Sequence, residues 1–92
     1  MNNARRKILN NANDIVREAL AKLSEALEMV EGVRDDEQDS LDNIPENLWG
    51  SERYEKSEEA VDNLESVISE IEDCMGSLDY SVCDSLDEIV IV

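Results

Sequence analysis

The amino-acid sequence predicts an all-α protein, namely a long antiparallel helical hairpin of the coiled-coil type. Apolar residues recur at alternating intervals of three and four over two long stretches, which is the spacing of a coiled-coil seam. The only proline, Pro45, lies between the two stretches and would end a helix. The 92 residues include only three glycines, which is too few turn residues for a many-stranded β fold. We therefore expect a single domain over residues 1–92.

The first expected helix spans residues 3–43. Asn2 or Asn3 can cap its start, because an asparagine side chain accepts a hydrogen bond from the first turn. Two adjacent apolar stripes follow the helix, and together they make a face wider than one partner helix covers. The first stripe contains Leu9, Val16, Leu20, Leu23, Leu27 and Val30, and the second contains Ile8, Ala12, Ile15, Ala19 and Ala26.

Residues 44–51 are expected to form the turn, and residues 52–90 the second helix, with Ser51 as its N-cap. Gly76-Ser77 is a weak point at which this helix could break. For the tail, Ile89–Val92, three forms stay open: a frayed end, a segment packed in a groove, or a short strand. The expected seam contains Val61, Leu64, Ile68, Ile71, Met75, Leu78 and Val82, and Ile89 and Val92 return in the same frame after Ser85.

Folding the chain about residues 47–48 brings bases of the first helix opposite acids of the second. The expected neighbours are Arg5, Arg6 and Lys7 with Asp84, Asp87 and Glu88, Arg17 with Asp79, and Lys22 with Asp73. A lone hairpin would leave the second apolar stripe in water, so we expect a homodimer packed as an elongated four-helix bundle. Its expected interface consists of Ile8, Ile15, Ala19, Leu20, Leu23, Leu27, Leu64, Ile68, Ile71, Met75, Leu78 and Val82.

The composition argues against an enzyme. Histidine is absent, which removes imidazole from acid–base catalysis and from metal binding. Residues 35–46 resemble a calcium loop in their carboxylates, but Ser40 stands where the sharp turn of that loop needs glycine. Cys74 and Cys83 lack the further ligands of a zinc site. We expect no catalytic residues, no metal and no cofactor.

The segment chemistry favours a cytoplasmic location. No apolar run approaches the length of a membrane span, and no apolar signal region follows the basic N-terminus. Cys74 and Cys83 are nine positions apart and lie on opposite sides of a continuous helix, so a disulfide between them is implausible. Free thiols are typical of a reducing compartment.

The net charge is −16 and is distributed unevenly. Residues 35–92 contain nineteen acids and only two bases, Arg53 and Lys56. Such a chain repels nucleic acid and anionic membranes and attracts cationic surfaces, so we expect a basic protein as partner. The candidate acidic face for this partner consists of Glu58, Asp62, Glu65, Glu72 and Asp79.

Three functions stay open. Carboxylates one helical turn apart have about the spacing of successive phosphates, so the acidic face could inhibit a nucleic-acid-binding protein by charge mimicry. Alternatively, the chain is a structural or oligomerisation module whose acids only give solubility. As a further alternative, it holds a small ligand between protomers. At the turn, Leu48, Trp49 and Tyr54 could anchor a partner or close the end of the bundle.

The segment around the turn resembles a known group of proteins. It contains Asn43-Ile44-Pro45-Glu46-Asn47-Leu48, then Ser51-Glu52-Arg53-Tyr54-Glu55-Lys56, then the run from Glu59 to Glu65. Over roughly residues 35–73 the chain is similar to small, uncharacterised acidic helical proteins of tailed phages and integrated mobile elements. The resemblance implies an accessory protein that acts inside an infected bacterial cell, and it brings no catalytic or binding residue with it.

Overall fold

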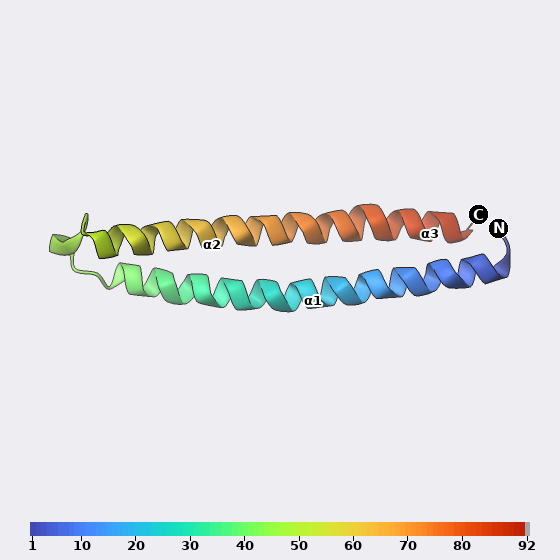
Figure 1. Ribbon diagram of the computed structural model, residues 1–92, viewed down its shortest axis with the longest axis horizontal. Helices are drawn as coiled ribbons and strands as arrows, with labels where there is room; N and C mark the ends of the chain where they lie inside the picture. Colours follow the sequence, from blue (N-terminus) through green and yellow to red (C-terminus); the bar gives the residue numbers. More distant parts are fainter. Residues whose placement is uncertain (92) are drawn as a thin grey trace.

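The computed structural model describes residues 1–91 and consists of two long helical rods that lie side by side (Figure 1). Its elements are the α-helix α1 (Asn3–Asp42), the short 3₁₀-helix η1 (Glu46–Leu48), the α-helix α2 (Glu52–Ser77), the π-helical segment η2 (Leu78–Cys83) and the α-helix α3 (Asp84–Ile91). The Cα atoms extend over 70 × 16 × 14 Å. The described residues contain no strand, so the predictions of an all-α fold with two long helices and an elongated shape are confirmed.

The ends of α1 follow from local chemistry. The side-chain oxygen of Asn2 accepts a hydrogen bond from the Arg5 amide at 2.8 Å and so caps the first turn. At the other end the amide of Asn43 donates to Asp39 O at 3.1 Å, and Pro45 then prevents the helix from continuing. The 40 residues of α1 are about 60 Å long at 1.5 Å per residue.

The connection between the rods is short and hydrogen-bonded. The amide of Leu48 donates to Pro45 O at 2.8 Å within η1. Gly50 has a φ of +87°, a left-handed conformation that side chains disfavour. The Ser51 hydroxyl accepts a hydrogen bond from the Tyr54 amide at 3.2 Å and starts α2. The rod of α2, η2 and α3 then leads back, so both ends of the chain lie at the end opposite the connection (Figure 1).

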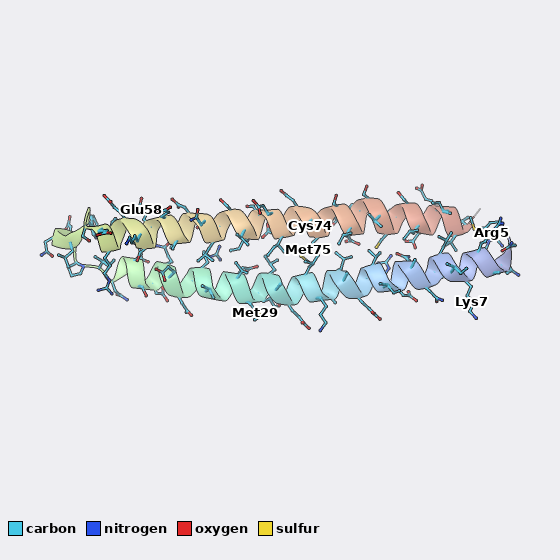
Figure 2. All side chains as sticks on the ribbon, viewed as in Figure 1. Arg5, Lys7, Met29, Glu58, Cys74 and Met75 are labelled. Carbon is cyan, nitrogen blue, oxygen red and sulfur yellow. The ribbon has the colours of Figure 1, made fainter. Side chains whose placement is uncertain are left out.

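The core is a single layer of side chains between the rods, and Met75 points into it (Figure 2). We call a residue inward when its side chain lies in this layer. Most inward residues are only half-buried, because a second helix covers each of them from one direction alone. Within residues 1–91 the buried residues are Asn13, Leu41, Val61, Ile68 and Cys83.

The π-helical segment η2 changes which residues of the second rod are inward. A π turn contains one residue more than an α turn, so every later side chain turns to a new side. Cys83 is 0% exposed whereas Val82 is 39% exposed, and the predicted seam through Val82 is therefore wrong. If the regular spacing of the predicted seam continued past Val82, the polar residue Ser85 would face α1. From the last residue of η2 onward the inward residues are Cys83, Leu86 and Val90, while Ile89 is exposed.

The rod is irregular close to the predicted weak point. Gly76 and Ser77 are the last two residues of α2, and η2 begins directly after them. The second rod continues through η2 into α3 as one unbroken helical path (Figure 1). Of the predicted tail, Ile89 and Ile91 lie in α3, and Val92 lies outside the described residues.

Candidate partner-binding surface

The two rods give the molecule two broad sides. Side chains one position after an inward residue turn toward one side, and side chains one position before it turn toward the other. Because α1 leads away from the termini and the second rod leads back, this rule selects the same side of the molecule on both rods.

Four of the five acids predicted as the acidic face directly follow inward residues of the second rod, in α2 and at the start of η2. They are Glu58, Glu65, Glu72 and Asp79, at intervals of seven, and Asp62 lies beside them. All are exposed except Asp79, which is half-buried, and the Glu58 side chain points away from α1 (Figure 2). The structure therefore places the acidic face along one side of α2 and the start of η2.

The bases of α1 do not neutralise this acidic face. Arg17 pairs with Asp87 at 3.3 Å and not with Asp79, so that predicted pair is wrong. The reason is that helical side chains lean toward the N-terminus of their helix, and Arg17 therefore reaches toward α3. Lys22 pairs at 3.4 Å with Glu25 of its own helix. Among the described residues, none of the five acids of the acidic face forms an ion pair.

A shallow groove of about 290 Å³ lies next to the acidic face, between α1 and the second rod. Leu20, Leu27 and Met75 give it an apolar floor, while Glu72 and Asp79 give it an acidic rim. Gly76 also lines the groove and leaves its floor open because it has no side chain. The exposed ring of Tyr80 completes the lining. Sequence reasoning missed Tyr80, since its position depends on η2.

The aromatic residues at the connection hold it together. The rings of Trp49 and Tyr54 pack with centroids 6.0 Å apart at an angle of 33°. Trp49 Nε1 donates a hydrogen bond to Ile44 O at 3.2 Å, which ties the start of the connection to its end. Trp49 nevertheless stays 56% exposed, and Leu48 is exposed beside it.

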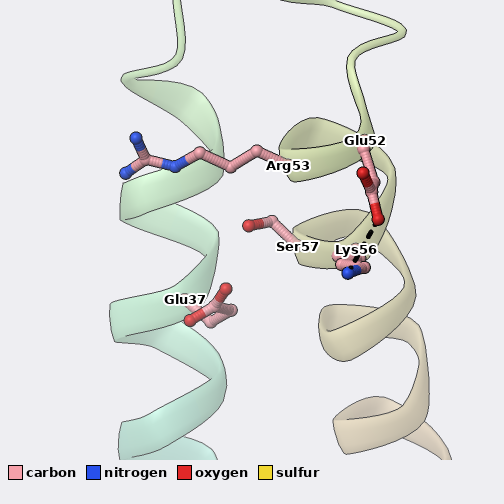
Figure 3. A pocket seen from close by; sticks show the side chains of 5 residues that line it. All are labelled: Glu37, Glu52, Arg53, Lys56 and Ser57. Atoms are coloured by element: carbon pink, nitrogen blue, oxygen red, sulfur yellow. Dashed lines mark ion pairs between the residues drawn. The ribbon is translucent and has the colours of Figure 1, made fainter.

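A second opening, of about 400 Å³, lies between the rods near the connection (Figure 3). Arg53 extends from α2 toward α1, and Ser57 and Glu37 point into the space between the rods (Figure 3). Lys56 Nζ forms an ion pair with Glu52 Oε1 at 2.9 Å. Both bases of residues 35–92 therefore lie at this opening.

The predicted interface residues fall into two sets. Ile8, Ile15, Ala19 and Val82 are exposed. The remainder are half-buried or, in one case, buried, and they are Leu20, Leu23, Leu27, Leu64, Ile68, Ile71, Met75 and Leu78. This second set fills the layer within one chain, and three of its members, Leu20, Leu27 and Met75, also line the groove. The first set is exposed to solvent.

Other chemistry is sparse in the described part of the chain. No group of three or more His, Cys, Asp or Glu side chains there could hold a metal ion. Residues 35–42, the start of the calcium-loop pattern, are helical in α1. Both cysteines are free thiols, with Cys74 exposed and Cys83 buried. None of the described helices combines the length and the apolar character needed to cross a bilayer.

No protein-family model, curated protein or solved structure matches this chain. The charge and shape of its two sides are therefore the basis for a functional proposal.

Proposed function

We propose that the chain is a non-enzymatic antiparallel helical hairpin that dimerises and binds a basic, nucleic-acid-binding protein through its acidic face. Binding inhibits that protein, because the carboxylates occupy the surface that would otherwise hold phosphates. The single observation that carries the proposal is the row of carboxylates on one side of the second rod without paired bases. The resemblance to phage and mobile-element proteins supports the cytoplasm of a bacterial host as the setting.

The spacing of the acidic face suits a surface made for phosphates. Glu58, Asp62 and Glu65 follow one another at intervals of four and three, which places neighbouring carboxylates about 5–6 Å apart. Phosphates along a nucleic-acid strand rise about 3.4 Å per nucleotide, and their helical path makes the true step longer. A rigid helix holds its carboxylates in place before binding, so little side-chain order has to be gained when the partner arrives.

The groove beside the acidic face adds an apolar anchor point. Its floor of Leu20, Leu27 and Met75 fits one large apolar side chain, and its acidic rim fits the lysines or arginines around that side chain. An arginine of the partner can also stack on the exposed ring of Tyr80. The partner segment is therefore cationic with a single aliphatic or aromatic residue in its middle.

The test is capture of proteins from bacterial lysate by two variants with equal net charge. The first variant, Glu65→Gln/Glu72→Gln/Asp79→Asn, neutralises the acidic face. The control, Glu59→Gln/Asp73→Asn/Glu88→Gln, neutralises three acids on the outer edge of the second rod. We expect the captured proteins to be nucleic-acid-binding proteins that duplex DNA releases. We further expect at least about ten-fold weaker capture by the first variant, since several charge contacts are lost together.

Equal capture by both variants would contradict the proposal. Capture that survives a change from low salt to about 0.15 M salt without weakening would also contradict it, because such salt screens exposed charges over about 8 Å.

A second candidate function is an oligomerisation module. The observation in its favour is the exposed apolar surface of α1, where Ile8, Ile15 and Met29 face solvent. In that case neutralising the acidic face leaves the activity of the chain unchanged, while loss of the dimer abolishes it.

A further inference from the structure

We propose that α1 packs antiparallel against α1 of a second copy, so that the two connections lie at opposite ends of the dimer. The contact lies on the side of the molecule opposite the acidic face. We call this side the acid-poor face, and it consists of the residues that directly precede an inward residue. The inference rests on the dimer proposed above and adds its orientation, its register and its ion pair.

Each rod contributes two rows to the acid-poor face. The central row lies near the other rod, and the outer row lies nearer the edge of the molecule. On α1 the central row contains Arg5, Ala12, Ala19, Ala26, Val33 and Ser40, and the outer row contains Ile8, Ile15, Lys22, Met29 and Asp36. On the second rod the central row contains Arg53, Ala60, Val67, Cys74, Val82 and Ile89, and the outer row contains Lys56, Asn63, Glu70, Ser77 and Ser85.

The two rows of α1 form one apolar surface that is open to solvent. Ile8, Ile15 and Met29 are 66%, 64% and 74% exposed, and Met29 points away from α2 (Figure 2). Together the two rows follow each other at alternating intervals of four and three. This is the spacing of a helix that packs against another helix.

The charge of the acid-poor face favours a second copy as its occupant. Of the 24 acids of the chain only Asp36 and Glu70 lie on this face. Two copies of a chain with a net charge of −16 repel each other wherever acids face acids. The acid-poor face is therefore the side on which two copies can approach with the least repulsion.

The contrast between the two outer rows selects the orientation. In a symmetric dimer with both connections at the same end, α1 lies on the second rod of the other copy. Ile8, Ile15 and Met29 would then face the outer row of the second rod, in which every member is polar or charged. With the connections at opposite ends, α1 lies on α1 instead. The apolar surface then covers its own counterpart and leaves water.

The register follows from the sizes of the side chains along α1. In an antiparallel pair a residue of the central row lies opposite a residue of the outer row. When residues whose numbers add up to 41 lie opposite each other, a larger side chain meets a smaller one in each apolar pair. These pairs are Ile8 with Val33, Ala12 with Met29 and Ile15 with Ala26.

The same register joins two opposite charges at the ends of the apolar surface. Arg5 meets Asp36 of the second copy, and the symmetry of the dimer makes this contact twice. In the described part of the chain, none of the ion pairs includes Arg5 or Asp36. A shift by one repeat of seven would place Arg5 opposite Met29 or Asn43, and Asp36 would lose its partner. The charges therefore select this register.

Lys22 is the charged residue in the middle of the apolar surface, opposite Ala19 of the second copy. Its apolar stem lies over the surface while Nζ reaches the edge of α1, where it contacts Glu25 at 3.4 Å. Glu18 of the second copy lies on the same edge, one position from the height of Lys22. Lys22 therefore gains a second carboxylate in the dimer and need not be buried as a charge.

The second rods meet each other in the same dimer. The symmetry axis passes between residues 20 and 21 of α1. The groove that Leu20 and Leu27 share with Met75 and Asp79 places this height at about residues 77–79 of the second rod.

The apolar members of the central row on the second rod are arranged symmetrically about this height. Cys74 and Val82 lie four positions before and after residue 78, and Val67 and Ile89 lie eleven positions before and after it. Val82 therefore lies level with Cys74 of the second copy, and Ile89 lies level with Val67. The interval of eight between Cys74 and Val82 contains the extra residue of η2.

The contact is large enough for a stable dimer. In this register residues 3–38 of α1 overlap with the same residues of the second copy, over about 54 Å at 1.5 Å per residue. With the 16 Å width of the two rods this gives about 860 Å² per partner, close to the ~800 Å² of a typical stable interface. Arg53 and Lys56, near the connection, lie beyond the contact and stay in water.

Charge exchange tests the ion pair, with the dimer dissociation constant measured by sedimentation equilibrium. We expect Arg5→Glu and Asp36→Arg each to raise the constant about ten-fold, since each change makes two attractive contacts repulsive. The double variant should return within about three-fold of the original value. Residues 5 and 36 of one chain are about 46 Å apart along α1, so this recovery can only come from contacts between antiparallel copies.

Two further changes are compared with matched controls. Glu28→Arg reverses an acid that directly follows an inward residue of α1, on the side of the acidic face, and should not weaken the dimer. Ile15→Asp should weaken the dimer by more than about a hundred-fold, with helicity by circular dichroism unchanged. Ile91→Asp is the same change at an 83% exposed residue outside the acid-poor face and should alter the constant by less than about three-fold.

Spin labels on Asp39→Cys, in a Cys74→Ala background, test orientation and register together. Cys83 is 0% exposed and stays unlabelled in the folded chain. In the proposed register the two labels lie 37 positions apart along the rods, which is about 56 Å. A shift by one repeat of seven changes this distance by about 10 Å. Connections at the same end give at most about 30 Å, because helices in a bundle are about 10 Å apart.

A chain that stays monomeric, a double variant that does not recover, or labels about 30, 45 or 66 Å apart would each overturn the inference. Failure of the proposed function looks different, because the three-acid variant of the acidic face would then capture its partners normally while the dimer is unaffected.

Discussion

Asn13 and Asp87 are joined by a hydrogen bond of 2.7 Å from the Asn13 amide to a carboxylate oxygen of Asp87, across 74 positions of the sequence. The amide is only 6% exposed, and its own oxygen has no hydrogen-bond partner. A buried polar pair between two helices fixes their register, since any slip leaves the amide buried and unpaired.

Removing the Asp87 side chain should therefore destabilise the fold. We expect Asp87→Ala to lower the free energy of unfolding in urea by about 1–2 kcal/mol, because the buried amide of Asn13 loses its partner. Asn13→Leu should raise it by about 1 kcal/mol, since the buried oxygen without a partner disappears as well. Arg17→Ala is the control for the exposed pair with Asp87 and should change stability by less than about 1 kcal/mol. A destabilised Asn13→Leu variant would contradict this account.

Deleting a residue from η2 should be tolerated. Removal of the exposed Tyr80 converts the π turn into an α turn, while Cys83, Leu86 and Val90 stay inward. We expect the unfolding free energy to be unchanged or higher. Removal of Ser69, an exposed residue of regular α2, turns all later side chains by about 100° and should cost several kcal/mol. Similar losses for the two deletions, measured by urea unfolding, would rule out the π segment as the source of the frame change.

The charged inward residues of α1 should limit its stability. Glu37 points between the rods where an apolar side chain would normally lie (Figure 3). We expect Glu37→Leu to raise the unfolding free energy by about 1–2 kcal/mol through apolar burial. Asp39→Leu, on the exposed side of the same helix, is the matched control and should change it by less than about 0.5 kcal/mol. Thermal and urea unfolding followed by circular dichroism provide both values.

Substitution by alanine should have opposite effects on stability at Gly32 and at Gly50. A Cβ atom meets nothing within 4 Å at either Gly32 or Gly50, so crowding does not distinguish them. Gly32 lies inside α1, and Gly32→Ala should stabilise the chain by about 1 kcal/mol through helix propensity. Gly50 has a φ of +87°, and Gly50→Ala should therefore destabilise the folded chain by about 1 kcal/mol. The same sign for both variants in urea unfolding would be inconsistent with the described connection.

Salt should stabilise the fold. The net charge of −16 makes the compact state repel itself, and the ion pairs of Arg17 and Lys22 that oppose this are open to solvent. We expect the melting temperature to rise between about 0.01 M and 0.15 M NaCl, as the screening length falls from about 30 Å to 8 Å. An uncharged solute at equal osmolarity should not reproduce this rise. A lower melting temperature in salt would mean that attractive pairs dominate.

Local rules of the sequence predicted the helices well. The caps at Asn2 and Ser51 and the stop at Pro45 act through hydrogen bonds within a few residues, so the sequence displays them directly. The frame change after Leu78 could not be derived with the same ease, because Val82 is apolar and continued the regular pattern. The available signal was that Ser85 is polar while Leu86 and Val90, one position later, are apolar.

The candidate surfaces were predicted only in part. The acidic face could be predicted from intervals of seven in the sequence, and the structure leaves its five acids on one side of the second rod. The pairing of Arg17 was missed because counting positions ignores the lean of helical side chains. The exposed apolar residues of α1 beyond Ala26, namely Met29 and Val33, can be assigned to the outer surface only once the inward residues are known.

The position of both chain ends at the same end of the rods has a mechanical consequence (Figure 1). Force applied to the two ends would open the layer of side chains one level at a time, from the level of Leu9 and Val90 to that of Asn13 and Asp87 and onward, as in unzipping. A load between the connection and either end would instead shear many levels at once. The molecule should therefore yield to small forces in the first direction and resist much larger ones in the second.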